Sequence, residues 1–251
     1  MLRRRLAIAC LGAALCAQAQ QAEPAPLRFA TASVKPESSR AYIRKDVDPV
    51  MLRWHSTPLR VIMDDAWHLR GYQVIGLQMD MASRWDIDGR TDGPTTTAQK
   101  YEMLRTLIVE RFGLKFHREM RDLPGYALVI AKGGSKLHEV KEGEVTSGNP
   151  GAEMEYGVIT GRRVRMEDWV GFFSNELGAP FEDDTGLKGL YDFKLEWSPE
   201  ATPRGGREPR DPDGLSLFVA LQQQLGLKLE PKKIPVEMFV IDNLNKTPTE
   251  N

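Results

Sequence analysis

Cysteine is almost missing from this chain of 251 residues, and the little that it has lies at one end. The two cysteines, Cys10 and Cys16, both fall within the first 20 residues. If that end is removed, the remaining protein has neither a disulfide nor a thiol, and packing alone must stabilise its fold. This composition excludes thiol nucleophiles and cysteine-based zinc sites from the rest of the chain.

Histidine and excess positive charge are also scarce. The four histidines are scattered along the chain, and no two have the i, i+4 spacing of a helical metal site: His55, His68, His117 and His138. We therefore expect no metal site and no bound cofactor. The 34 basic residues are balanced by 35 acidic ones. This balance argues against general binding to nucleic acid or to an anionic membrane.

The first 19 residues have the three parts of a cleavable export signal. Arg3, Arg4 and Arg5 form a basic region, Leu6 to Cys16 is apolar, and Ala17-Gln18-Ala19 is a small-x-small cleavage site. The apolar run is shorter than the roughly 20 residues that span a bilayer. We expect a periplasmic or secreted protein, with lipid attachment at Cys16 as an open alternative. No long apolar run follows residue 27, so no membrane span is expected after cleavage.

Strand and helix patterns alternate along the rest of the chain, which predicts an α+β fold with mixed or antiparallel sheets and helices packed on one face. A first domain is expected over 27–140. Thr57 and Pro58 are expected to open its first helix, which Gly71 ends, and the triplet at 95–97 begins a second helix that ends at Gly113. Strands over 114–121 and 126–131 are predicted to form a hairpin around a turn at 122–125.

A polar segment over 141–154 is the expected linker, and a second domain should occupy 155–247. This domain should contain a helix after Arg165, a strand over 191–197, a flexible loop over 198–213 and a final helix over 215–225. Two strands, 227–232 and 236–244, are expected to close the chain. The five tryptophans fall mostly on predicted apolar faces, so we expect them in the core: Trp54, Trp67, Trp85, Trp169 and Trp197.

The two predicted domains look alike. Phe112-Gly113-Leu114-Lys115-Phe116 corresponds to Leu225-Gly226-Leu227-Lys228-Leu229, and Trp85-Asp86-Ile87 corresponds to Tyr191-Asp192-Phe193. In the same order, a proline-containing turn and a strand follow each copy. These matches predict two tandem copies of a strand-helix-strand-strand-helix-strand-strand unit. Ordinary helix–glycine–strand junctions, which any α+β protein contains, are the alternative explanation.

No motif for a catalytic nucleophile, a zinc peptidase or a phosphate-binding loop occurs in the sequence. We therefore assign no catalytic residue. Three aspartates are surface or turn candidates: Asp86 and Asp192, which recur at matching strand positions, and Asp184, which precedes a Thr-Gly turn. A strand aspartate can simply tie down a neighbouring loop. Carboxylates brought together in a cleft could instead do acid–base chemistry.

Several segments together resemble a known family, and they span both predicted domains in order: Phe29–Pro36, Arg111–Glu119, Tyr126–Lys132, Asp184–Phe193, Ala220–Leu229 and Val240–Asp242. The chain is similar to a soil-associated family of secreted bacterial proteins of unknown function. The resemblance implies an exported protein, and a domain that also occurs as a tail on antirepressor-type membrane metallopeptidases. It implies no catalytic residues, because no activity is established for the family.

Three functions are compatible with these observations. The first is a non-catalytic extracytoplasmic binding, interaction or sensor-like module, whose partner is an envelope protein or a small ligand. Its edge strands could pair with a strand of a partner. The second is a secreted hydrolase that uses carboxylates such as Asp86, Asp184 or Asp192. The third is a structural component of the envelope.

Overall fold

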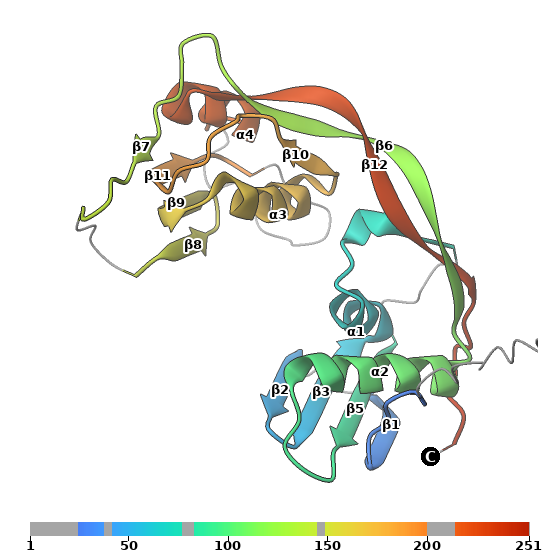
Figure 1. Ribbon diagram of the computed structural model, residues 1–251. Coiled ribbons are helices and arrows are strands. Elements are labelled where there is room, and N and C mark those ends of the chain that lie inside the picture. The colour runs from blue at the N-terminus through green and yellow to red at the C-terminus, as the bar shows by residue number, and fades with distance from the viewer. Residues whose placement is uncertain (1–24, 38–41, 77–82, 145–148, 200–213, 251) are drawn as a thin grey trace, which may run out of the picture.

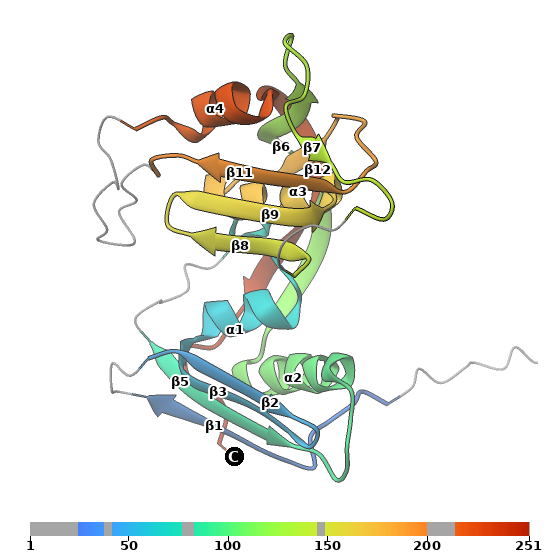
Figure 2. The ribbon, with the colours of Figure 1, turned by 90° about the vertical axis from the view of Figure 1, so that its left-hand side faces the viewer.

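The computed structural model describes residues 25–37, 42–76, 83–144, 149–199 and 214–250. In this part of the chain the strands form three four-stranded sheets, with orders β1-β5-β3-β2, β10-β6-β12-β4 and β7-β11-β9-β8. Two lobes lie at the ends of a long two-stranded ribbon, which forms the middle sheet (Figures 1 and 2). The mixture of strands and helices confirms the predicted α+β class. The predicted export signal, Cys16 included, lies outside the described residues, as does nearly all of the predicted loop over 198–213.

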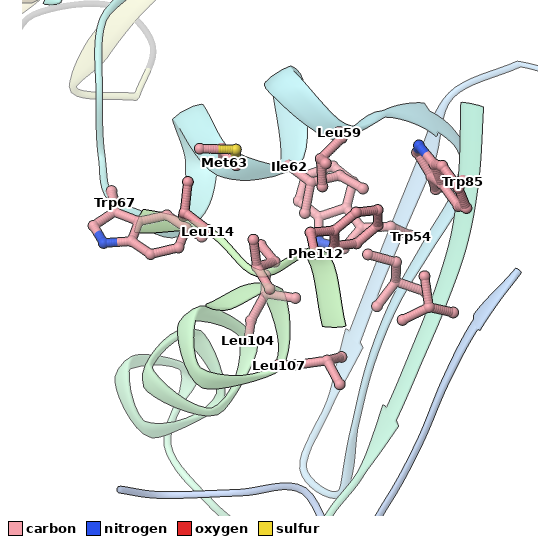
Figure 3. Close-up of a cluster of buried hydrophobic side chains, with 14 of the residues drawn as sticks. Trp54, Leu59, Ile62, Met63, Trp67, Trp85, Leu104, Leu107, Phe112 and Leu114 are labelled. Carbon is pink, nitrogen blue, oxygen red and sulfur yellow. The ribbon is translucent and has the colours of Figure 1, made fainter. Parts of the chain in front are cut away.

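The first lobe consists of one sheet with two helices on one face (Figure 2). Its strands are β1 (Thr31–Glu37), β2 (Arg44–Asp48), β3 (Met51–Pro58) and β5 (Arg84–Arg90), and every pair is antiparallel. The helices are α1 (Leu59–Ala66) and α2 (Thr97–Phe112). Between helices and sheet lies a core that includes Trp54, Ile62 and Phe112 (Figure 3).

The second lobe has the same layers. Strands β7 (His138–Glu139), β8 (Gly151–Glu155), β9 (Val158–Val164) and β11 (Tyr191–Glu196) form its sheet. Helix α3 (Met166–Leu177) and the short helix α4 (Leu217–Ala220), which continues as a π-helical turn over Leu221–Leu225, supply the helical layer. The core of this lobe is rich in aromatic side chains, among them Trp169, Phe173 and Phe193. All five tryptophans are buried, as predicted.

The ribbon joins the lobes and draws on both halves of the chain. Its two strands, β6 (Lys115–Ile130) and β12 (Leu227–Asn243), pair antiparallel over nearly their whole length. β4 (Val74–Gly76) adds to β12 at the first lobe, and β10 (Phe181–Asp183) adds to β6 at the second. Each lobe therefore contributes a parallel strand to a ribbon strand that begins in the other lobe.

The predicted hairpin over 114–131 is wrong, and so is the proline-containing turn expected between the last two strands, because β6 and β12 run through these residues. Pro124 lies opposite Lys233, and Pro235 lies opposite Asp122, within the continuous ladder. A proline and a glycine next to each other favour a turn when only local sequence is considered. In the central stretch the ribbon has just two strands, and a proline there can direct its missing N–H outward, where no ladder bond is lost.

The helix boundaries differ from the prediction at α1. Pro58 is the N-cap rather than the first helical residue, and the Thr57 hydroxyl donates to the carbonyl of His55 instead of capping the helix. α1 ends at Ala66, well before Gly71, which begins a short 3-10 turn (Gly71–Gln73). The predicted left-handed cap is confirmed at Gly113, where φ is 55°.

The elements follow one another in the same order in the two lobes. The series β2, β3, α1, β4, β5, α2, β6 in the first half corresponds to β8, β9, α3, β10, β11, α4, β12 in the second. This is a correspondence of topology, and the sequence repeat stays a prediction, as does the division into domains. Strand β8 lies partly within the segment predicted as a linker, whose polar composition gave no strand signal.

Candidate binding groove

A groove of about 630 Å³ lies at the open end of the first lobe. It is lined by the end of β1, the start of β5 and the chain after β12: Val34, Pro36, Glu37, Ser83, Arg84, Trp85, Lys246, Thr247, Pro248, Thr249 and Glu250. The volume falls in the range of about 300–1,000 Å³ that is usual for small-molecule sites. Among the grooves found in the described residues, it is larger than the others named below.

The floor of the groove is apolar because it continues the core of the lobe. Pro36 lies opposite Trp85, and Val34 opposite Ile87, on the face of the sheet that the helices cover. The Trp85 ring meets the ring of Phe112 edge-to-face at a centroid distance of 5.1 Å. Helix α2 ends at Phe112. The groove therefore lies beside this helix end, with Trp85 in its lining.

The other wall of the groove is the tail over 245–250, which is fastened to the end of α2. The N–H of Asn245 donates to the carbonyl of Phe112, and the N–H of Thr249 donates to the carbonyl of Arg111, both at 2.8 Å. The Arg111 guanidinium donates in turn to the carbonyls of Thr249 and Glu250. These bonds hold Lys246, Thr247 and Pro248 as a bridge over the groove.

Charged groups of both signs surround this apolar floor. Glu37 and Glu250 are acidic, and Arg84 and Lys246 are basic. Arg84 is held in place because its Nη1 donates to the carbonyl of Ser56 at 2.7 Å. The arrangement suits a ligand with an apolar body and polar or dipolar ends, since the floor offers burial and the rim offers charge.

Two smaller hollows lie elsewhere. One, of about 190 Å³, lies between α2 and the chain entering β1 and is lined by residues such as Phe29, Leu107 and Arg111. The other, of about 130 Å³, lies at the start of α3 and includes Arg165 and Asp183. Both are smaller than the usual small-molecule site.

Asp86 and Asp192 occupy corresponding strand positions, and each accepts a hydrogen bond from the backbone N–H of a residue near the start of a helix. An Oδ1 of Asp86 accepts from the N–H of Ser56 at 2.8 Å, and an Oδ1 of Asp192 accepts from the N–H of Arg163 at 2.7 Å. Ser56 and Arg163 have left-handed φ values of 46° and 52°. The strand register shifts at both places, so each aspartate fastens a β-bulge just before a helix.

Asp184 has a different role from the one expected. It is Asp183 that closes the turn, since its Oδ1 accepts from the N–H and the hydroxyl of Thr185 at 2.9 and 2.6 Å. Asp184 instead pairs with Lys232 of the ribbon at 2.7 Å, and Glu182 lies equally close to the same ammonium. The hydrogen bonds that the Lys232 ammonium donates to Asp184 and then to Glu182 raise the pKa of Lys232. In the described part of the chain, no hydrogen bond or ion pair joins any two of Asp86, Asp184 and Asp192.

The histidines also stay apart. His55 lies 3.7 Å from Asp46 and 3.9 Å from Asp86, on the face of the first sheet away from the helices. His117 pairs with Asp242 at 2.9 Å, and His138 with Glu144 at 2.7 Å. Over the described ranges, no group of three His, Cys, Asp or Glu side chains is placed to hold a metal ion.

A polar cluster that the sequence did not reveal lies under the edge of the first sheet. Lys45 donates to Asp65 and to the Tyr101 hydroxyl, both at 2.8 Å, and Tyr101 donates to Asp65 at 2.7 Å. The Lys45 ammonium also lies 5.0 Å from the centroid of Trp54. Lys45, Asp65 and Tyr101 are far apart in sequence and belong to β2, α1 and α2, so no local sequence motif predicts the cluster.

The electrostatics of this cluster favour a structural role. Burial opposes the charge of Lys45, but its bonds with Asp65 and Tyr101 outweigh burial and raise the pKa of Lys45. Burial raises the pKa of Tyr101. A lysine that is held protonated is neither a nucleophile nor a base at neutral pH. The cluster ties the edge strand β2 to both helices.

The groove itself was missed by sequence reasoning because its walls come from opposite ends of the chain. The tail over 245–250 has no strand or helix periodicity, and nothing in its composition indicates where it docks. No helix in the described residues is long and apolar enough to cross a membrane.

The comparisons with known proteins give a family but no activity. Residues 60–244 match the family described as "Protein of unknown function (DUF3738)". No curated protein and no solved structure matches the chain. The matched segment contains both ribbon strands, α2, α3, α4 and all of α1 except its first residue, whereas β1 and the tail of the groove lie outside it. Because the match covers well over half of its length, the chain belongs to this family of proteins of unknown function.

Proposed function

We propose that this protein is exported and acts outside the cytoplasm as a binding module, with the groove of the first lobe as its ligand site. The observation that carries the proposal is the groove of about 630 Å³, whose apolar floor at Val34, Pro36 and Trp85 is bordered by charge. Such a site buries an apolar ligand body while the rim orients its polar ends. We infer a compact amphiphilic small molecule as the ligand class.

The export part of the proposal rests on the signal-like residues 1–19. We expect the protein recovered outside the cytoplasm to begin at Gln20. N-terminal sequencing or intact mass measurement of that fraction tests this. Recovery of a chain that retains Met1, or of none outside the cytoplasm, would contradict it.

The groove is tested with a neutral apolar dye, N-phenyl-1-naphthylamine, whose fluorescence rises when it is buried. We expect saturable binding at one site. Thr247→Trp should weaken it at least about tenfold, since the exposed Thr247 lines the groove and an indole there fills it. Lys132→Trp places the same indole on an exposed turn of the second lobe and should change nothing.

Two outcomes would contradict the groove as the site. One is equal binding by the protein, Thr247→Trp and Lys132→Trp. The other is dye binding that persists in Arg111→Ala, because Arg111 holds the tail that forms one wall. Urea unfolding of each variant checks that the change comes from the groove and not from loss of packing, which also exposes dye-binding surface.

A further inference from the structure

The edge strand β8 of the second lobe has no neighbour along its outer edge among the described residues. In the described part of the chain β8 pairs with β9 alone, and all five of its residues are exposed. An open strand edge presents unpaired backbone N–H and C=O groups to other chains. Natural proteins usually protect such an edge with charges that point along it or with cover from another element.

The corresponding strand of the first lobe, β2, is also an edge strand, but it carries an inward-pointing lysine, which is one of the devices that protect a strand edge. Counting from the bulge residues Ser56 and Arg163, β2 corresponds to β8, with Lys45 opposite Trp54 and Ala152 opposite Gly161. On β2, Lys45 is bonded to Asp65 and Tyr101 under the sheet. On β8 the corresponding residue is alanine. The second lobe thus lacks the cluster of Lys45, Asp65 and Tyr101, here called the polar clip, which ties β2 to the helices of the first lobe.

One face of β8 is apolar and uncovered. Met154 lies opposite Ile159, and Ala152 opposite Gly161, and both Ile159 and Gly161 are buried under the helical layer. The helical layer does not extend over β8, since Met154 remains 59% exposed. A strand added along β8 would place alternate side chains beside Met154 and bury it.

The other face of β8 is acidic. Glu153 and Glu155 point there, and the Glu153 side chain is 73% exposed although it lies 3.0 Å from Arg162. Among the described residues Glu155 forms no ion pair. Opposite charges across a strand pair stabilise it, and like charges destabilise it. A partner strand should therefore carry basic side chains on this face.

The acidic face also argues against a second copy of this chain as the occupant. In an antiparallel two-fold pair of β8 strands, the register that pairs all five residues sets Glu153 opposite Glu153. This repulsion recurs whenever the two strands face each other in that register. The occupant that the edge fits is a segment of a different protein.

We propose that β8 is a docking edge for an extended segment of another protein, in which apolar and basic side chains alternate. The segment adds to the sheet of β7, β11, β9 and β8 as a fifth strand. Its apolar side chains lie beside Ala152 and Met154, and its basic side chains beside Glu153 and Glu155. This site is separate from the groove and does not depend on the function proposed for it.

The test uses the purified protein and a fluorescein-labelled heptapeptide of alternating lysine and valine, capped at both ends. We expect saturable binding in fluorescence anisotropy. Met154→Lys should weaken it at least about tenfold, because it sets a charge on the apolar face and repels the lysines. The matched control is Val47→Lys on β2, which occupies the corresponding exposed position and should leave binding unchanged.

Two further peptides separate strand addition from simple charge attraction. The same peptide with alternate backbone nitrogens methylated should not bind, since it cannot form the ladder. A glutamate–valine peptide should not bind either. Equal binding of the methylated peptide, equal loss in Val47→Lys and Met154→Lys, or dimerisation of the protein through β8 in sedimentation would each overturn the proposal.

Discussion

The two lobes share one topology but close it in different ways. In the first, the edge strand is held by Lys45, Asp65 and Tyr101, and the same Lys45 ammonium lies over the ring of Trp54. In the second, Ala152 and Gly161 occupy the corresponding places, and the ring of Phe193 fills the space above Gly161. Trp169 then packs on Phe193 at a centroid distance of 3.7 Å. The same arrangement of strands is thus completed by a polar clip in the first lobe and by aromatic rings packed against each other in the second.

The difference teaches which features of the topology are required and which are free. The aspartate-fastened bulge and the left-handed glycine that ends the last helix occur in both lobes. The layer beneath the edge strand differs. Features that set the path of the backbone are retained, whereas side chains that fill the space can be exchanged as long as the space is filled.

The largest expected effect comes from disrupting the packing of the Phe193 ring on Gly161 in the second lobe. A Cβ at position 161 would lie 1.9 Å from the Phe193 ring, so Gly161→Ala forces the ring out of its place. We expect a loss of about 3 kcal/mol in the free energy of unfolding, measured by urea titration. Gly71→Ala in the first lobe is the control, because a Cβ there meets nothing within 4 Å. A loss below about 0.5 kcal/mol in Gly161→Ala would refute the packing argument.

The second prediction tests whether the two bulges are equivalent. Asp86→Ala and Asp192→Ala each leave the N–H of a left-handed residue without its charged acceptor, and each should lose about 1.5–2 kcal/mol. Glycine tolerates the left-handed conformation, so Ser56→Gly and Arg163→Gly should recover about 1 kcal/mol in the respective variants. The measurement is the urea midpoint at constant slope. If the two losses in the free energy of unfolding differ by more than about 1 kcal/mol, the two bulges are not equivalent.

The smallest expected effect concerns the polar clip. Tyr101→Phe removes one donor to Asp65 and one acceptor from Lys45, and we expect a loss of about 1 kcal/mol at neutral pH. Because the protonated forms of Lys45 and Tyr101 are favoured in the folded state, their pKa values are raised by folding. Their contribution is complete below about pH 10 and is lost as the pH rises through the folded pKa values.

The alkaline branch of the stability profile therefore distinguishes the lobes. Above about pH 10 the protein should lose stability more steeply than Tyr101→Phe or Lys45→Met. Phe172→Leu, a change in the second lobe at the position corresponding to Asp65, should leave the alkaline slope as it is. Parallel slopes for the protein and Tyr101→Phe would show that the clip does not couple to protonation.

The success and failure of sequence reasoning follow the range of the interactions involved. Gly113 as a helix cap and the five buried tryptophans were predictable because a cap and an apolar stripe are local patterns. The predicted hairpin was wrong because Pro124 and Gly125 resemble a turn, while the strand that keeps them extended is remote in sequence. The groove and the polar clip could not be predicted, since each joins side chains whose proximity only the folded chain creates.

The ribbon also has a consequence for the order in which the protein matures. Phe239 and Ile241, near the end of the chain, belong to the core of the first lobe, and Leu128 belongs to the core of the second. The first half can therefore not complete its core until the last strand has been synthesised. Contacts between such remote residues form slowly, because closing a long loop is entropically unfavourable. A chain with this delay stays open while it is being made, and an open chain is the state that the proposed export would require.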